Sequence, residues 1–148
     1  MRHLLIALIA FVVQSCGDTY STEDKTNFDK QIETYLTEKG IQCQRSPSGM
    51  YYTIIKKGEG RNVIYKDLVS FNYKGEFLDG TVFDEQKKPV EFQVRQLIGA
   101  WKEIMLELKK GSTVFLVAPP FLGYGSHQLE AIPPHSILVF NMTVMDIK

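Results

Sequence analysis

The sequence has few of the residues on which most catalytic and structural centres depend. Only two of its 148 residues are cysteines, Cys16 and Cys43, so no framework of several disulfides is available. No cluster with metal-ligand spacing, no glycine-rich phosphate loop and no Ser/His/Asp set stands out along the chain. These absences argue against metal-dependent, nucleotide-dependent and hydrolytic enzymes, and we expect neither a metal nor a cofactor.

The sequence also lacks an excess of charge of either sign. Seventeen basic and seventeen acidic residues cancel, and no basic stripe alternates with aromatic side chains. Nucleic-acid binding needs such a basic surface, so we expect no nucleic-acid partner. At this length and with 44% hydrophobic residues, the chain can bury one sizeable core. We therefore expect one globular domain with an N-terminal appendage.

No apolar run is long enough to span a membrane, but one is long enough for export. Residues 4–13 are apolar and follow Arg2 and His3, whereas a spanning helix needs about 20 apolar residues. Residues 1–15 are therefore interpreted as a signal peptide. Residues 13–16, which read Val-Gln-Ser-Cys, resemble a bacterial lipobox and predict lipidation of Cys16. The predicted product is an exported, membrane-anchored lipoprotein of the periplasm or outer membrane.

Two alternatives apply if Cys16 is not lipidated. In one, the protein is an ordinary secreted protein and Cys16 is incidental; in the other, Cys16 and Cys43 form a disulfide. A polar stretch directly after Cys16 favours the lipid.

Composition divides the mature chain into three parts. Residues 16–27 are polar without an apolar period, which predicts a lipid-anchored flexible tether. Residues 28–46 form a helical segment, and residues 47–148 form the main domain.

The helical segment has apolar residues at helical spacing on one face. Asn27 is a candidate N-cap, and Gly40 marks the end of the helix. The apolar residues are Phe28, Ile32, Tyr35 and Leu36. Such a face usually covers a core, so we expect this helix to pack on the main domain; docking to a partner is the alternative.

The main domain has strand signals with one helix among them. Its β-branched and aromatic runs are residues 51–55, 68–73, 90–94, 113–118 and 137–147. Residues 97–108 have an apolar face that includes Trp101, and Gly111 follows them as an end signal. This order predicts the α+β class, with an antiparallel sheet wrapped on one helix.

Four short sequence motifs and one tryptophan carry a resemblance to a known family. The motifs are residues 71–75 (Phe-Asn-Tyr-Lys-Gly), 79–84 (Asp-Gly-Thr-Val-Phe-Asp), 123–125 (Gly-Tyr-Gly) and 131–135 (Ala-Ile-Pro-Pro-His), with Trp101 between the second and the third. In this order they resemble the FKBP family of peptidyl-prolyl isomerases, the rapamycin-binding immunophilins. The resemblance runs from about residue 47 to residue 148. It implies a strongly curved half-barrel sheet that wraps around one short helix, with a short N-terminal helix added here.

The resemblance implies a site for rotation about X-Pro peptide bonds. Amide resonance sets the barrier at about 18–20 kcal/mol, and a dry apolar site can lower it without a nucleophile, metal or cofactor. The implied catalytic residues are Tyr73, Phe83, Asp84 and Tyr124. The implied substrate-binding residues are Phe92, Leu97, Ile98, Trp101, Ile132 and Phe140.

Each of these residues has an implied role. Trp101 forms the floor beneath the proline ring, while Tyr73, Phe83 and Phe140 form the walls. Ile98 offers its backbone N–H to a substrate carbonyl, and the Tyr124 hydroxyl does the same. Asp84 orients Tyr73 and faces the rotating carbonyl.

The sequence departs from the family pattern in two loops. The segment of residues 85–91 is shorter than its counterpart in well-known members and contains no arginine to pair with Asp84. We therefore expect Asp84 to be a partly solvated edge group that contributes less to turnover than Phe83. Residues 125–130 lack a glycine-rich flap, so rapamycin-type macrolides are expected to bind weakly.

The predicted function is a monomeric folding helper with isomerase activity. Its partners would be proline-containing polypeptides among exported proteins, and the membrane through the lipid on Cys16. The alternative is a catalytically weak chaperone or protein-binding module that keeps the same fold. The resemblance extends to FKBP-like lipoproteins of the Bacteroidetes.

Overall fold

The computed structural model describes residues 19–148 of the chain. The predicted signal peptide and Cys16 lie outside these described residues. Within them, no helix combines the length and apolar character needed to cross a membrane. Cys43 is a free, half-buried thiol.

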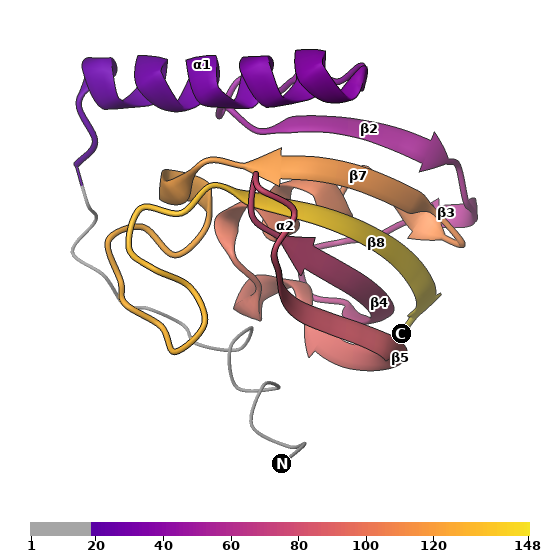
Figure 1. Ribbon diagram of the computed structural model, residues 1–148. Helices are drawn as coiled ribbons and strands as arrows, with labels where there is room; N and C mark the ends of the chain where they lie inside the picture. Colours follow the sequence, from indigo (N-terminus) through magenta and orange to yellow (C-terminus); the bar gives the residue numbers. More distant parts are fainter. Residues whose placement is uncertain (1–18) are drawn as a thin grey trace.

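A six-stranded antiparallel sheet forms the main domain (Figure 1). Its spatial order is β1-β2-β7-β8-β4-β5, and a separate two-stranded sheet pairs β3 with β6. The strands are β1 (Gln44–Arg45), β2 (Tyr51–Lys56), β3 (Glu59–Asn62), β4 (Leu68–Glu76), β5 (Val82–Gln93), β6 (Lys109–Lys110), β7 (Thr113–Ala118) and β8 (Leu138–Ile147). The predicted α+β fold, with a curved sheet around one short helix, is confirmed.

The central strand β7 is apolar from Val114 to Ala118 because both of its faces are buried there. Val114 and Leu116 face the core that contains α2, whereas Phe115 and Val117 belong to a second core beneath α1. Successive side chains of a strand point to opposite faces, so a strand covered on both sides needs an uninterrupted apolar run. This helical cover on each face explains why residues 113–118 show no polar alternation.

The helix on the inner face, α2 (Gly99–Met105), is shorter than the predicted helix over residues 97–108. Ile98 has an extended backbone and is the N-cap, so Leu97 and Ile98 precede the helix. At the other end, Glu107 and Leu108 make i to i−3 hydrogen bonds, and the chain leaves through a tight turn. The predicted apolar face is retained, with Trp101, Ile104 and Met105 all buried.

The N-terminal helix α1 (Thr22–Lys39) packs across the outer face of the sheet (Figure 1). Ile32 and Leu36 are buried there against a cluster that includes Tyr51 and Val139. Packing on the main domain, rather than docking to a partner, is therefore the arrangement that the structure shows. Gly40 ends the helix in the left-handed conformation, as predicted.

The predicted start of α1 at Phe28 with an Asn27 cap is wrong. Ser21 is the N-cap: its side chain accepts from the Asp24 N–H, and the Asp24 carboxylate accepts from the Ser21 N–H. This reciprocal pair is a capping box, a start signal that a search for apolar periodicity overlooks. Residues 22–27 are accordingly helical, which corrects the predicted flexible tether over this part of residues 16–27.

Strand β5 is much longer than the predicted run of residues 90–94. It begins at Val82 and includes the polar residues from Glu85 to Lys88 and also Pro89. It pairs only with β4 and is an edge strand, where lysine and proline are tolerated because one side of the ladder faces solvent. Residues 85–91 are therefore part of a bulged strand.

Candidate active site

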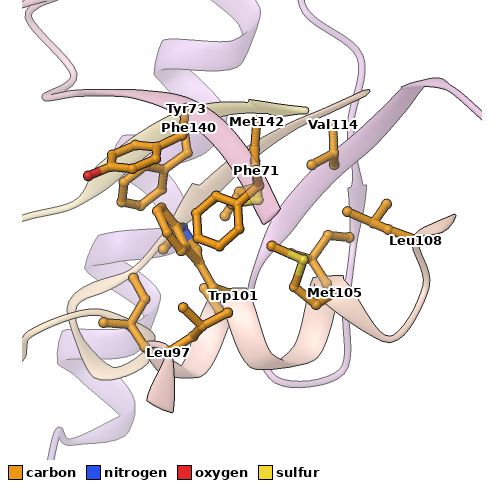
Figure 2. Packing of buried hydrophobic residues seen from close by; sticks show 14 of the residues in the cluster. Phe71, Tyr73, Leu97, Trp101, Met105, Leu108, Val114, Phe140 and Met142 are labelled. Carbon is orange, nitrogen blue, oxygen red and sulfur yellow. The ribbon is translucent and has the colours of Figure 1, made fainter. Parts of the chain in front are cut away.

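Trp101 is the centre of a cluster of aromatic rings between α2 and the sheet. Its ring lies edge-to-face with those of Phe71, Tyr73 and Phe140, at centroid distances of 5.3, 4.9 and 4.9 Å. Figure 2 shows Trp101 rising from α2 toward these three rings. The indole Nε1 is buried and has no hydrogen-bond partner within residues 19–148. Edge-to-face packing holds the indole in one orientation.

Phe83 reaches this cluster because the edge strand has a bulge at its position. Glu76 pairs with Val82 and Gly75 pairs with Asp84, so Phe83 is an extra residue between two paired positions of β5. The Phe83 ring lies edge-to-face with Phe140 at 5.8 Å. A bulge breaks the alternation of the strand, which lets Phe83 and Asp84 both turn toward the same core.

Gly75 makes room for the Phe83 ring. A Cβ atom at this position would lie 2.5 Å from Cζ of Phe83 and 3.1 Å from Cε1 of Phe140. The first distance is too short for a carbon contact and the second is tight, so a side chain at position 75 would displace the Phe83 ring. Ring packing therefore explains why the motif at residues 71–75 ends in a glycine.

Asp84 is buried and hydrogen-bonded on both carboxylate oxygens. Its side chain receives the Tyr73 hydroxyl on Oδ2 and the Gln86 amide Nε2 on Oδ1, the latter at 3.4 Å. The residue is 4% exposed. The expectation of a partly solvated carboxylate without an orienting partner is therefore wrong. Tyr73 and Gln86 orient Asp84 in place of an arginine.

The two tyrosines of the candidate site remain neutral well above physiological pH. Burial raises the pKa of Tyr73, and its hydrogen bond to Asp84 raises that pKa further. Burial also raises the pKa of Tyr124, with a second contribution from the negative charge of Asp84. Both groups are therefore hydroxyl donors, and Tyr124 lies close enough to Asp84 to feel its charge.

The other predicted site residues lie in the same core. Leu97, Ile98 and Ile132 are buried in it, and the half-buried Phe92 packs against it. Leu97 and Ile98 come from the segment before α2, whereas Ile132 comes from the long connection between β7 and β8. Ile98 N–H makes no backbone hydrogen bond within the described residues. The structure thus brings together every apolar residue that the resemblance implied.

Three residues of the site were missed in the sequence. Phe71 packs edge-to-face on Trp101, and its ring centroid lies 6.3 Å from that of Phe92. Gly75 makes room for Phe83, and Gln86 donates to Asp84. The motif at residues 71–75 contains the first two of these positions. No local signal pointed to Gln86, because its role depends on the register between β4 and β5.

The chemistry of the cluster is that of a dry site with one negative charge. It presents aromatic faces, two neutral tyrosine hydroxyls and a buried carboxylate. Among residues 19–148, no group of His, Cys, Asp and Glu side chains is placed to hold a metal ion. The arrangement suits an apolar ring with a carbonyl group beside it.

Comparison with known proteins places these features in a family. The sequence profile described as FKBP-type peptidyl-prolyl cis-trans isomerase matches residues 59–145. The FKBP-type peptidyl-prolyl cis-trans isomerase FkpA of Buchnera aphidicola subsp. Schizaphis graminum is 38% identical, over 95% of this chain and 61% of its own length. The outer membrane protein MIP of Legionella longbeachae is 34% identical, over 85% of this chain and 55% of its own.

A solved structure extends the similarity to three dimensions. The crystal structure of FkpA from Escherichia coli superposes with a TM-score of 0.74 at 33% identity, covering 85% of this chain and 60% of that one. The chain thus spans about half to three fifths of the length of these relatives.

Proposed function

Because the chain belongs to the family of FKBP-type peptidyl-prolyl cis-trans isomerases, we propose that it catalyses rotation about X-Pro peptide bonds. The observation that carries this proposal is the buried Asp84 carboxylate, held by Tyr73 at the edge of the Trp101 cluster. The substrates would be polypeptides that present an apolar residue followed by proline.

The aromatic cluster would act by replacing water around the twisting amide. A planar amide is stabilised by resonance and by hydration of its charge-separated form, and a twisted amide loses much of this charge separation. An apolar surface disfavours the planar form more than the twisted one. Trp101 would support the proline ring, and Phe83 and Phe140 would exclude water from it.

Asp84 would add an electrostatic contribution. A fixed negative charge that faces the carbonyl oxygen repels the planar amide, which carries more negative charge on oxygen, more strongly than the twisted amide. Burial strengthens this field, because little water is present to screen it. The Ile98 N–H and the Tyr124 hydroxyl would hold flanking carbonyls of the substrate.

The proposal is tested by catalysis on a short peptide. Wild type should accelerate cis-trans isomerisation of an X-Pro peptide, and Phe83→Ala should lower kcat/KM about tenfold, because side-chain burial of this size contributes roughly 1.5–3 kcal/mol. Tyr65→Ala serves as the control, since Tyr65 is 54% exposed and outside the cluster. Peptide binding without acceleration by wild type would favour a binding or chaperone module instead.

We further propose that the protein is an exported lipoprotein anchored through Cys16. The motif at residues 13–16 and a relative named as an outer membrane protein support this location. Several acyl chains on Cys16 would hold the protein in the bilayer, since each buried methylene contributes about 0.8 kcal/mol. The exported folding helper would then act as a monomer close to the membrane, and rapamycin-type macrolides would bind its short-looped site weakly.

Lipidation is tested on protein extracted from membranes. Mass spectrometry should find acyl chains on an N-terminal Cys16, and Cys16→Ser should release the protein into the soluble fraction. Cys43→Ser is the matched control and should remain in the membrane fraction. An intact Met1 on the extracted protein, or a Cys16→Ser variant that fractionates like wild type, would contradict the proposal.

A further inference from the structure

The long connection between β7 and β8, residues 119–137, carries two residues of the candidate site. It supplies Tyr124 and Ile132. Two backbone hydrogen bonds close it: Gly125 N–H donates to the Pro120 carbonyl, and His135 N–H donates to the Gly125 carbonyl at 2.7 Å. His135 is thus hydrogen-bonded directly to Gly125, the residue that follows Tyr124. We call this connection the site loop.

Tyr20 contacts both ends of the site loop. Its hydroxyl lies 2.8 Å from Nδ1 of His135, and its ring lies edge-to-face with the His135 ring at a centroid distance of 5.7 Å. The same ring lies 6.0 Å from the ring of Phe121, near the start of the loop. One side chain therefore connects the beginning and the end of the segment that carries Tyr124.

Tyr20 is itself held by the first turns of α1. It directly precedes the Ser21 cap, and its ring lies edge-to-face with Phe28 at 5.4 Å. Lys25 adds a second contact between the helix and the loop, because its Nζ lies 5.4 Å from the centre of the Phe121 ring. The N-terminal end of α1 and the site loop lie on the same side of the molecule (Figure 1).

His135 has an uncommon backbone conformation that depends on surrounding contacts. His135 is the only residue other than glycine with positive φ within residues 19–148, at 60°. This left-handed conformation is uncommon for residues with a Cβ and persists where surrounding contacts hold it. The exposed His135 side chain contacts Tyr20, which lies more than one hundred residues away in sequence, and interacts electrostatically with Asp24 in the first turn of α1.

We propose that Tyr20 is a positioning residue for the site loop, so that the N-terminal helix forms part of the active-site architecture. This inference rests on the proposed isomerase function. Tyr20 acts through His135 on the loop closure at Gly125 and so on the placement of Tyr124 and Ile132. Groups that hold the substrate equally in its planar and twisted forms affect KM more than kcat. Loss of the Tyr20 contact should therefore appear mainly in KM.

Two Tyr→Phe variants on the same helix interface test this inference. Tyr20→Phe removes the hydroxyl that meets His135 and keeps the ring contacts. Tyr51→Phe removes a hydroxyl that donates to Asp29 and Glu33 of α1, on a part of the interface that lies outside the site loop. We expect Tyr20→Phe to raise KM for an X-Pro peptide about two- to tenfold with little change in kcat, as for the loss of one hydrogen bond, and Tyr51→Phe to leave both constants unchanged.

Amide hydrogen exchange on the full-length protein gives a readout that does not need catalysis. The Gly125 and His135 amides should exchange faster in Tyr20→Phe than in wild type and in Tyr51→Phe. Asparagine tolerates the left-handed backbone, so His135→Asn should reproduce both the higher KM and the faster amide exchange. Combining it with Tyr20→Phe should add little, because the two substitutions break the same contact.

The outcomes separate this inference from the proposed function. An inactive wild type would defeat the proposed function, and the exchange comparison alone would then decide whether Tyr20 holds the loop. An active wild type with equal KM and equal amide exchange in the two tyrosine variants would overturn the inference.

Discussion

Replacing Asp84 with alanine should lower kcat/KM on an X-Pro peptide by about ten- to hundredfold. Asp84 is 4% exposed, and its carboxylate accepts hydrogen bonds from the Tyr73 hydroxyl and the Gln86 amide. Removal of Asp84 takes away the charge that would face the substrate carbonyl and leaves the Tyr73 hydroxyl buried without this acceptor. The effect should therefore equal or exceed that of Phe83→Ala, whereas a solvated Asp84 predicts the reverse order.

Two further variants separate the charge of Asp84 from its hydrogen bonds. Asp84→Asn keeps the shape and an acceptor for Tyr73 but loses the charge, so it should lose most of the activity if the field matters. Glu85→Ala is the control, because Glu85 is the next residue of β5 and is exposed. The measurement is kcat/KM after circular dichroism and a thermal melt confirm folding. Activity of Asp84→Asn near that of wild type would contradict the electrostatic role.

The sheet and the inner helix could be predicted because burial of their side chains leaves an apolar pattern in the local sequence. Residues 113–118 were predicted as a strand with the bounds that β7 has, since a strand covered on both faces is uniformly apolar. Trp101 was placed on the buried face of a helix by the spacing of its apolar neighbours. In such segments, tertiary contacts reinforce the local pattern.

The edge of the sheet could not be predicted in the same way. A bulge at Phe83 and a second irregularity between the pairs Phe71–Val90 and Tyr73–Gln86 set the register of β5. Both depend on pairing with β4 rather than on the residues of β5 alone. The burial of Asp84 and its contact with Gln86 follow from this register, so the local sequence indicated a solvated turn instead.

Contacts of the N-terminal helix were hidden for a related reason. Residues 19–27 are polar or small apart from Tyr20, and their helical start depends on the capping box of Ser21 and Asp24. Two partners of Tyr20, Phe121 and His135, lie about one hundred residues further along the chain. No periodicity within a short window reveals contacts at such a separation.

Replacing Ile32 with alanine should lower the free energy of unfolding by about 2–4 kcal/mol, which corresponds to a melting midpoint roughly 4–16 °C lower in a domain of this size. Ile32 is fully buried between α1 and the outer face of the sheet, in a cluster with Phe115 and Val139. Truncation to alanine leaves a cavity that the sheet beneath cannot close, because β7 and β8 are packed on their other face by the Trp101 core.

Thr34→Ala provides the matched control on the same helix. Thr34 is exposed, so its replacement changes helix propensity by a fraction of a kcal/mol and removes no packing. Thermal and urea unfolding of both variants should show one cooperative transition, shifted only for Ile32→Ala. Equal midpoints would mean that α1 adds nothing to the core. Two separate transitions in wild type would mean that α1 unfolds independently of the sheet, and its N-terminal end could not then hold the site loop while the domain remains folded.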